Sequence, residues 1–239
     1  MDHLDRHRVL DAIVRRLSRH VEGERWLVRG GMHMRGALPG LGRVVRDLDL
    51  VAREPFDQAA VRETFAEVLA WPMDDGVAFD ARVASEPRFR VGRQDHWLAV
   101  RGFIEDRSVI VGIDLAYGVP FGRPQPMGPT SRLHRADPAS VVARKIELLR
   151  AFGPAWWRPK DLYDVHRWLT VAPPQCLGEA LEARLGTVTR VRGALALGPH
   201  ANRPWRRFVE ASAPSALPDV TWVLEEVRHE LAPFLGSAS

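Results

Sequence analysis

The spacing of hydrophobic residues changes near the middle of the chain, and this change constrains the fold more than any other feature. Before residue 119, segments at strand spacing alternate with helical segments, and the apolar segments 96–103 and 108–118 are joined by a short polar turn. After the Pro- and Gly-rich segment 119–133, only helical spacing remains. The sequence therefore predicts an α/β (α+β) N-terminal domain with a mixed sheet, followed by an α-helical C-terminal domain.

We place the domain boundary in the Pro- and Gly-rich segment, which gives a first domain over 1–125 and a second over 126–239. Asp137 is a suitable N-cap, and Pro138 suits the first position of the helix that follows. The expected strands are 25–29, 44–52, 96–103 and 108–118, and the expected helices are 4–21, 57–70, 138–152, 158–169, 177–186 and 217–235.

The composition is that of a soluble globular protein, with 46% hydrophobic and 27% charged residues. No apolar run reaches the roughly 18 residues that a membrane span needs, and the N-terminal segment is too charged for a secretory signal. The single cysteine, Cys176, excludes an intrachain disulfide and fits a reducing compartment. We therefore expect a cytoplasmic protein with no membrane partner.

Two aspartates share one face of an expected strand. Asp47 and Asp49 are two residues apart, so they point the same way, while Leu48 and Leu50 point into the core. Adjacent carboxylates repel each other, and Mg²⁺ relieves this by binding one or two carboxylates together with substrate phosphates. Asp114 lies alone in a later apolar strand and is a candidate third ligand of a two-metal site. The alternative is that all three are strand residues exposed near turns.

A glycine pair precedes these acids. Gly30 and Gly31 follow the strand over 25–29, where glycine allows unusual dihedrals and close approach to a ligand. If a helix begins there, its free N–H groups form an anion site. A glycine pair alone is also consistent with an ordinary turn. Together with the acids, the pair predicts a phosphate cradle beside a metal site, which suits nucleotidyl transfer.

With these motifs identified, the sequence resembles the nucleotidyltransferases of the DNA polymerase β-like superfamily, and within it the AbiEii toxin family. The resemblance runs from about residue 10 to residue 170, and its motifs occur in the family's order. The four matching segments are "LVRGGMHMRG", "VVRDLDLV", "VGIDLAYG" and "VVARKIELLRAFGPAWWRPKDLYDVHRWL".

The fourth segment contains Lys145 and Lys160, the chain's two lysines. The resemblance implies that Lys145 contacts the nucleotide or its phosphates, that Asp161 and Asp164 lie near the site, and that Arg158 and Lys160 are the motif's basic residues. A structural alternative exists for each lysine. Lys145 would then extend from an apolar helix face, and Lys160 would form an i, i+4 ion pair with Asp164.

The chain departs from the family pattern at two positions. Met32 follows the glycines where the family usually has Ser or Thr, and Val45 stands at a second hydroxyl position. Arg43 or Arg46 remains available to hold phosphate. The three acids are unchanged, so the departures bear on substrate choice and rate.

The resemblance implies Mg²⁺-dependent transfer of a nucleoside monophosphate from a nucleoside triphosphate to an acceptor. The implied acceptor is RNA, with the tRNA 3′ end as the leading candidate, and the implied partner is the antitoxin of a type IV toxin–antitoxin or phage-defence system. The net charge of +4 lies entirely after residue 129, and Trp205, beside Arg206 and Arg207, is a candidate for base stacking. The acid-free span 183–209 carries Arg184, Arg190, Arg192, Arg203, Arg206 and Arg207.

Two other functions are consistent with the same residues. The acceptor could be a small molecule or a protein side chain, which would need an acidic or apolar pocket in place of a basic face. Alternatively, the chain could be a degenerate, non-catalytic regulator that binds nucleotide or RNA. Met32 and Val45 favour the non-catalytic regulator, and the three retained acids argue against it.

Overall fold

The structure is a computed structural model in which the chain forms two compact units. Unit 1 comprises Met1–Gly36 and Val44–Ala136, and unit 2 comprises Ala37–Arg43 and Asp137–Ser239. The assignment of separate functions to residues 1–125 and 126–239 stays a prediction. The residues that the structure describes are 3–40, 43–52, 58–80, 82–90, 93–118, 122–153, 158–171, 175–186, 195, 201–212 and 218–234.

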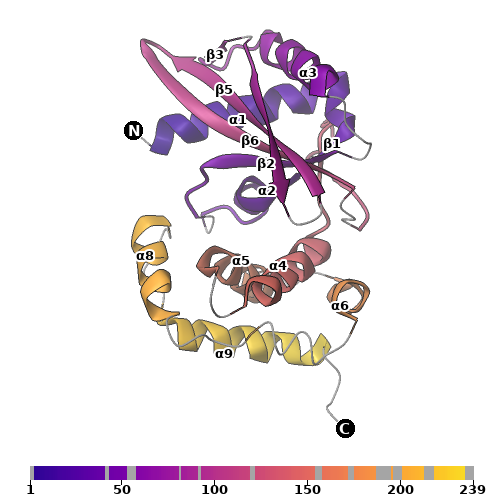
Figure 1. Cartoon of the computed structure of the whole chain (residues 1–239), viewed down its shortest axis with the longest axis vertical. Helices are drawn as coiled ribbons and strands as arrows, with labels where there is room; N and C mark the ends of the chain where they lie inside the picture. Colours follow the sequence, from indigo (N-terminus) through magenta and orange to yellow (C-terminus); the bar gives the residue numbers. More distant parts are fainter. Residues whose placement is uncertain are drawn as a thin grey trace. The chain divides into compact units, whose positions relative to one another are not determined.

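Unit 1 is built on a mixed sheet (Figure 1). Its described strands form an eight-stranded sheet in the order β3-β5-β6-β2-β1-β8-β7, with β4 paired to β5. The β1–β2 and β5–β6 pairs are antiparallel, whereas β2–β6 is parallel. The strands are β1 Trp26–Arg29, β2 Asp47–Ala52, β3 Ala78–Phe79, β4 Ala84–Arg90, β5 Arg93–Ile104, β6 Arg107–Tyr117, β7 Gln125–Pro126 and β8 His134–Arg135.

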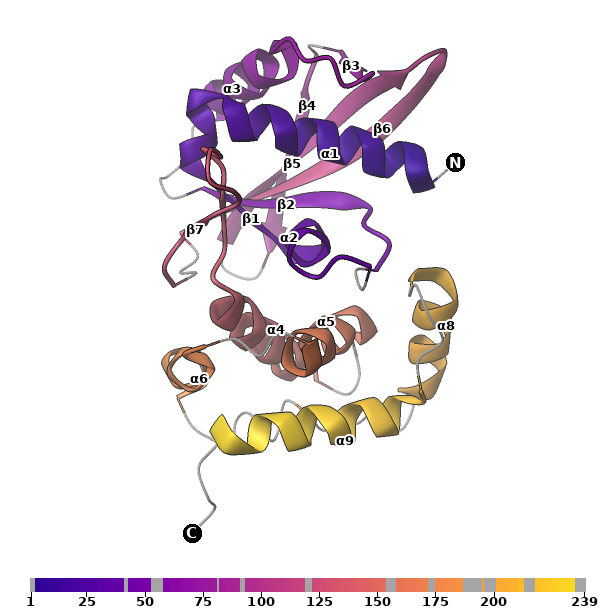
Figure 2. The same ribbon diagram turned by 180° about the vertical axis from the view of Figure 1, so that it is seen from behind.

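Helices α1 (His3–Arg19) and α3 (Gln58–Ala70) pack on one face of this sheet, as Figures 1 and 2 show from opposite sides. Short helices η1 (Val21–Arg25) and α2 (Gly30–Ala37) flank β1 in the sequence. The core joins apolar residues of α1 and α3 to alternate residues of the central strands. Its strand members include Leu48, Leu50, Leu98, Val100, Val111, Ile113 and Leu115.

Strand alternation then defines a second face of the sheet. Because Leu48 and Leu50 are fully buried in the core, Asp47 and Asp49 project from the opposite face. Gly102 of β5 supports the same assignment, because a Cβ there would come within 2.9 Å of Val9 on α1. The central strands therefore present their chemically active residues on the face that points away from α1.

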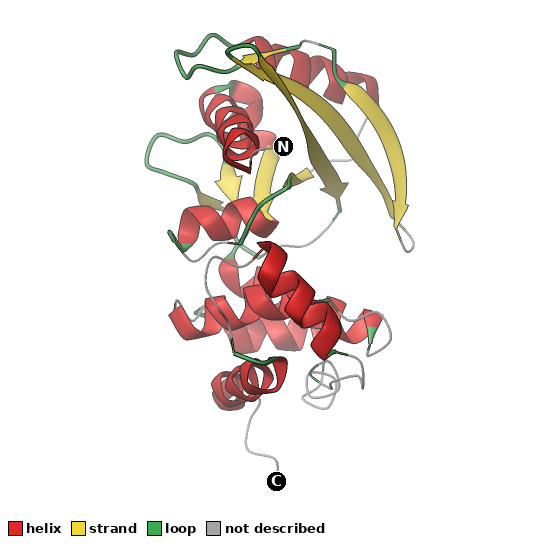
Figure 3. Cartoon of the chain, turned by 90° about the vertical axis from the view of Figure 1, so that its left-hand side faces the viewer, coloured by secondary structure: helices red, strands yellow, loops and turns green. Residues whose placement is uncertain are grey.

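Unit 2 is helical in its described residues, and all strands that the structure describes belong to unit 1 (Figure 3). Asp137 caps α4 as expected, because its Oδ2 accepts a hydrogen bond from the backbone N–H of Ser140 at 2.9 Å. The helices are α4 Pro138–Phe152, α5 Pro159–Val171, α6 Leu177–Leu185, α8 Asn202–Ser212, α9 Val220–Leu231 and η3 Ala232–Phe234.

The expected fold class is confirmed, but strands β3, β4, β7 and β8 were not expected from the sequence, and several expected elements differ at their ends. β2 begins at Asp47, three residues later than expected, and the expected cap Asp57 lies outside the described residues. Helix α8 was not expected from the sequence. None of the helices in the described part of the chain is long and apolar enough to cross a membrane.

Candidate active site

Strand β1 runs directly into helix α2 at Gly30, and the conformation there admits only glycine. Gly30 has φ +69°, and a Cβ on it would lie 2.0 Å from Oδ2 of Asp49. Both the dihedral and the lack of space exclude a larger residue without rearrangement. The carboxylate of Asp49 thus lies directly against the backbone at the start of α2.

The three acids are brought onto neighbouring strands in register. Asp49 on β2 pairs with Asp114 on β6, and Asp47 pairs with Gly112. Residues that pair in register project from the same face of a sheet. Asp47 and Asp49 are half-buried, and Asp114 is buried. Sequence analysis predicted the first two as a pair, and the register adds Asp114 to the same face.

A row of paired residues crosses five strands of unit 1. Arg29 on β1 is opposite Asp49, Asp49 is opposite Asp114, and Asp114 is opposite Trp97 on β5. Trp97 is in turn opposite Glu86 on β4. We call the four residues from Arg29 to Trp97 the acid row. Neighbouring strands are about 4.8 Å apart, so the two carboxylates of this row are close enough to repel each other when both are ionised. A cation near the middle of the row would relieve that repulsion.

The donors fit a magnesium ion in chemistry, although no complete cage is preassembled. Among the residues that the structure describes, no three His, Cys, Asp or Glu side chains converge into a group that could hold a metal. Mg²⁺ characteristically takes one or two carboxylates and completes its shell with water and substrate phosphates. Asp47 and Asp49 can supply such carboxylates, with Asp114 beside them on the next strand.

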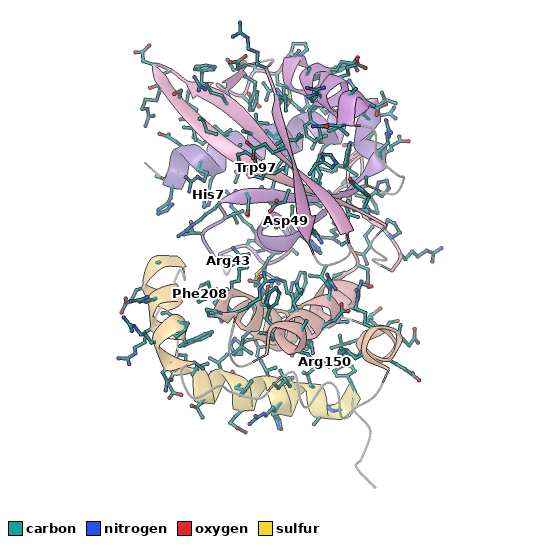
Figure 4. The ribbon with its side chains drawn as sticks, in the orientation of Figure 1. His7, Arg43, Asp49, Trp97, Arg150 and Phe208 are labelled. Atoms are coloured by element: carbon teal, nitrogen blue, oxygen red, sulfur yellow. The ribbon has the colours of Figure 1, made fainter. Side chains whose placement is uncertain are left out.

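Trp97 was not singled out in the sequence, and the structure places it beside the acids. Its Nε1 lies 2.4 Å from where a Cβ on Gly112 would be, so the indole lies across that glycine. Figure 4 labels Trp97 and Asp49 on the same sheet. The sequence did contain a signal for this contact, namely Gly112, because a glycine inside an apolar strand often marks the close approach of another group.

The segment before β2 holds the two arginines expected near phosphate. Arg46 is exposed, whereas Val45 is buried and its N–H donates to Nε2 of His7 on α1 at 3.2 Å. Burial lowers the pKa of His7, and the nearby Arg35 adds to this, which favours the neutral ring that can accept this bond. Val45 therefore anchors the segment through its backbone.

Unit 2 contains a buried cluster of charged residues around Lys145 of α4. Nζ of Lys145 donates to Asp164 Oδ2 at 2.6 Å and to Asp161 Oδ1 at 3.1 Å. Arg43 Nε donates to Asp164 Oδ1 at 3.2 Å, and Arg158 Nε lies 2.6 Å from Asp161 Oδ2. Five of the predicted site residues therefore form one cluster, which we call the lysine cluster.

The lysine cluster keeps Lys145 and Asp164 ionised despite their burial. Burial opposes the charged form of Lys145, but the carboxylates of Asp164 and Asp161 outweigh it, so the pKa of Lys145 is raised. For Asp164, burial is likewise outweighed by Lys145 and Arg43, and its pKa is lowered. Three cations then face two carboxylates, which leaves one excess positive charge within the cluster.

The two lysines do not occupy the positions that the alternative interpretations expected for them. Lys145 is buried and paired with two carboxylates, so it does not extend to solvent from an apolar face. Asp164 is fully buried against Lys145 and Arg43, whereas Lys160 is exposed at the start of α5. The i, i+4 spacing of Lys160 and Asp164 therefore did not reveal the partner of Asp164.

The expectation that Trp205 stacks on a base is wrong. Trp205 is buried in unit 2, where its Nε1 donates to the carbonyl of Pro218 at 3.0 Å and its ring packs against Phe208. Helix α8 instead turns Arg203, Arg206 and Arg207 outward. The sequence grouped tryptophan and arginines correctly in one segment, but helical spacing separates them onto opposite faces.

Known proteins share the family and the fold of this chain. Residues 11–226 match the family model described as "Nucleotidyl transferase AbiEii toxin, Type IV TA system". The match extends about 56 residues beyond the end of the segment in which motifs were identified, and it includes α6, α8 and most of α9. No curated protein sequence matches the chain.

Two solved structures from Helicobacter pylori share the fold. JHP933 is 14% identical, with a TM-score of 0.54 over 97% of this chain and 91% of that chain. A structure of a protein provisionally named a nucleotidyltransferase is 13% identical, with a TM-score of 0.55 over 97% of this chain and 93% of that chain. At this identity the likeness concerns the fold alone.

Proposed function

The chain belongs to the AbiEii family of nucleotidyl transferase toxins of type IV toxin–antitoxin systems, and we propose that it transfers a nucleoside monophosphate from a nucleoside triphosphate to RNA in the presence of Mg²⁺. Its family makes it a nucleotidyltransferase with an antitoxin partner and a nucleoside triphosphate substrate. The metal, the acceptor and the roles of individual residues are our proposal.

The observation that carries the proposal is the pairing of Asp49 with Asp114 beside Gly30. We assign Asp47, Asp49 and Asp114 as the Mg²⁺ ligands, with two metal ions in the complete site. When bound, Mg²⁺ neutralises phosphate charge and lowers the pKa of an acceptor hydroxyl. The start of α2, at Gly30 and Gly31, offers backbone N–H groups to the β- and γ-phosphates.

The proposed reaction forms one bond and breaks another at the α-phosphorus. The hydroxyl oxygen of the acceptor bonds to the α-phosphorus, and the bond from that phosphorus to the oxygen bridging the β-phosphorus breaks. Pyrophosphate leaves with that bridging oxygen. Asp114, on the strand farthest from Gly30 among the three acids, receives the hydroxyl proton.

The lysine cluster supplies the second part of the proposal. Its excess positive charge, carried by Arg43, Lys145 and Arg158 against Asp161 and Asp164, would favour a nucleotide phosphate. Asp161 and Asp164 hold the cations in fixed positions, and the exposed Lys160 adds positive charge at the start of α5. In unit 1, the exposed Arg46 is a further candidate for binding phosphate. We also propose that the helical domain completes the nucleotide site.

RNA is favoured as acceptor by the exposed arginines of α8. Arg203, Arg206 and Arg207 all lie on the exposed side of this helix, and such a group neutralises backbone phosphates. The tRNA 3′ end is our first candidate acceptor, and the cytoplasm is the compartment in which we propose the reaction occurs. Transfer to a small molecule or protein would need an acidic or apolar acceptor pocket instead.

A label-transfer experiment tests this function. Each α-³²P nucleoside triphosphate is incubated with Mg²⁺, total cellular RNA and the protein, and the products are separated on a gel. Wild type and Asp106→Asn, which changes an exposed aspartate of the β5–β6 turn, should label tRNA-sized RNA. Asp49→Asn should not. Label on protein or small molecules only, or none with any acceptor, would overturn RNA as the acceptor.

A further inference from the structure

Trp97 occupies a position at the acid row that suggests a role of its own. The row places it on β5, next to Asp114 and one strand farther from Gly30. Its indole lies across Gly112, and Gly112 is paired with Asp47 on the other side. The aromatic ring thus extends the surface that carries the three acids, and its side chain remains partly exposed.

The order of the strands indicates which substrate would meet this ring. Across the sheet the order is β1, β2, β6 and β5, which places the glycines, then the acids, then Trp97. In phosphoryl transfer the attacking and leaving oxygens are roughly in line at the phosphorus. If the leaving pyrophosphate lies at the glycines and the phosphorus at the acids, the attacking hydroxyl lies on the side of β6 and β5.

The same face continues along the hairpin with residues suited to a nucleic acid strand. Arg101 and Ile110 are cross-strand partners on the face that carries Trp97, and both are exposed. Arg101 can pair with a backbone phosphate, and Ile110 offers an apolar surface that is 49% exposed. Aromatic rings that stack on bases, together with cations that pair with phosphates, commonly hold a single strand on the face of a sheet.

We propose that Trp97 is the stacking platform for the terminal base of the acceptor strand, a single-stranded RNA 3′ end, a role that rests on the proposed transfer to RNA. The indole would hold the last base flat beside Asp114 and so position its ribose hydroxyl for attack. A ring that only fills the space over Gly112 is the structural alternative, because aromatic residues commonly cover strand glycines.

Matched substitutions separate these two roles. Trp97→Leu and Trp97→Phe both keep an apolar side chain over Gly112, but only phenylalanine retains an aromatic face. Trp71→Leu is the control, because it removes a tryptophan that is 42% exposed and packs against His20 away from the acid row. The probe is a fluorescein-labelled RNA heptamer ending in CCA, whose dissociation constant is measured by anisotropy without nucleotide and at fixed salt.

Stacking predicts that Trp97→Leu raises this dissociation constant, and the KM for RNA, by about 10-fold or more. The KM for the nucleoside triphosphate should stay unchanged, and Trp97→Phe and Trp71→Leu should resemble wild type. Unchanged RNA binding in Trp97→Leu would overturn the proposal. A raised KM for the triphosphate with unchanged RNA binding would also overturn it, because the ring would then serve the incoming nucleotide.

A measurement on wild type alone covers the case in which Trp97→Leu does not fold. A heptamer with 2-aminopurine as its 3′ base should lose fluorescence on binding, because stacking on the indole quenches it. A bound heptamer without quenching would overturn the proposal. If binding depends on Trp97 but no RNA is labelled in the transfer assay, the platform stands and only the proposed reaction fails.

Discussion

The carboxylate of Asp49 lies against the α-carbon of Gly30, so close that a Cβ on the glycine would be 2.0 Å from Oδ2. This contact joins the two motifs that the sequence presents separately, the glycine pair after β1 and the paired acids of β2. It also sets the distance between the start of α2, where phosphate would bind, and the carboxylates that would bind metal.

We predict that Gly30→Ala inactivates the protein. The new methyl group must displace Asp49, and a positive φ is strained for alanine. Since misplacing a reacting group by about 1 Å can cost 100-fold in rate, we expect nucleotide transfer to fall by about that factor.

Gly36→Ala on the same helix is the matched control for this substitution. Nothing lies within 4 Å of a Cβ at Gly36, so transfer should be unchanged and α2 slightly stabilised. Equal transfer rates for Gly30→Ala and wild type would show that the Asp49 contact is not needed for activity.

The chain's two lysines allow a direct test of the lysine cluster. Lys145→Met removes the cation between Asp161 and Asp164 and leaves both carboxylates buried with fewer partners. We expect the free energy of unfolding to fall by about 3 kcal/mol. Lys160→Met changes an exposed lysine and should alter it by less than about 0.5 kcal/mol. Urea unfolding followed by circular dichroism measures both, and similar values would contradict a buried ion cluster.

The lysine cluster also predicts a dependence of stability on pH. The lowered pKa of Asp164 means that its ionised form stabilises the fold above the unfolded pKa of about 4, and this stability is lost as the pH falls through the folded value. The raised pKa of Lys145 gives the opposite dependence on pH. The stability that its charged form contributes is present below about pH 10.4 and is lost as the pH rises through the folded value.

Asp164→Asn should remove the part of the stability loss at low pH that is due to this residue. We expect the variant to be less stable than wild type at pH 7 and to lose less stability between pH 5 and pH 3. Melting temperatures across this range measure the difference. Parallel curves for the two proteins would mean that the Asp164 carboxyl has the same pKa in the folded and unfolded chains.

The sequence was sufficient to predict the parts of the fold and site that depend on local spacing. The hairpin, the cap at Asp137 and the shared face of Asp47 and Asp49 all follow from alternation or from the chemistry of one residue. The pairing of Asp114 with Asp49 depends on strand register, which spacing along one strand does not specify.

The remaining features depend on contacts between residues far apart in the chain. Asp164 has Lys160 at helical spacing, but it pairs with Lys145 and Arg43, which come from other segments. Trp97 is an ordinary strand residue until Gly112 is placed beside it by the hairpin. Trp205 stands next to two arginines in sequence, but the unexpected helix α8 buries the ring and exposes the arginines.

The most direct test of the central claim is metal binding by the acid row. Mn²⁺, which can replace Mg²⁺ at oxygen sites, is titrated into the protein with a non-hydrolysable nucleoside triphosphate, and free Mn²⁺ is measured by electron paramagnetic resonance. Wild type and Asp106→Asn should bind Mn²⁺ alike, and Asp49→Asn should bind it at least about 10-fold more weakly, since a charged ligand is lost. Equal binding by Asp49→Asn and wild type would contradict the assignment of this row as the metal site.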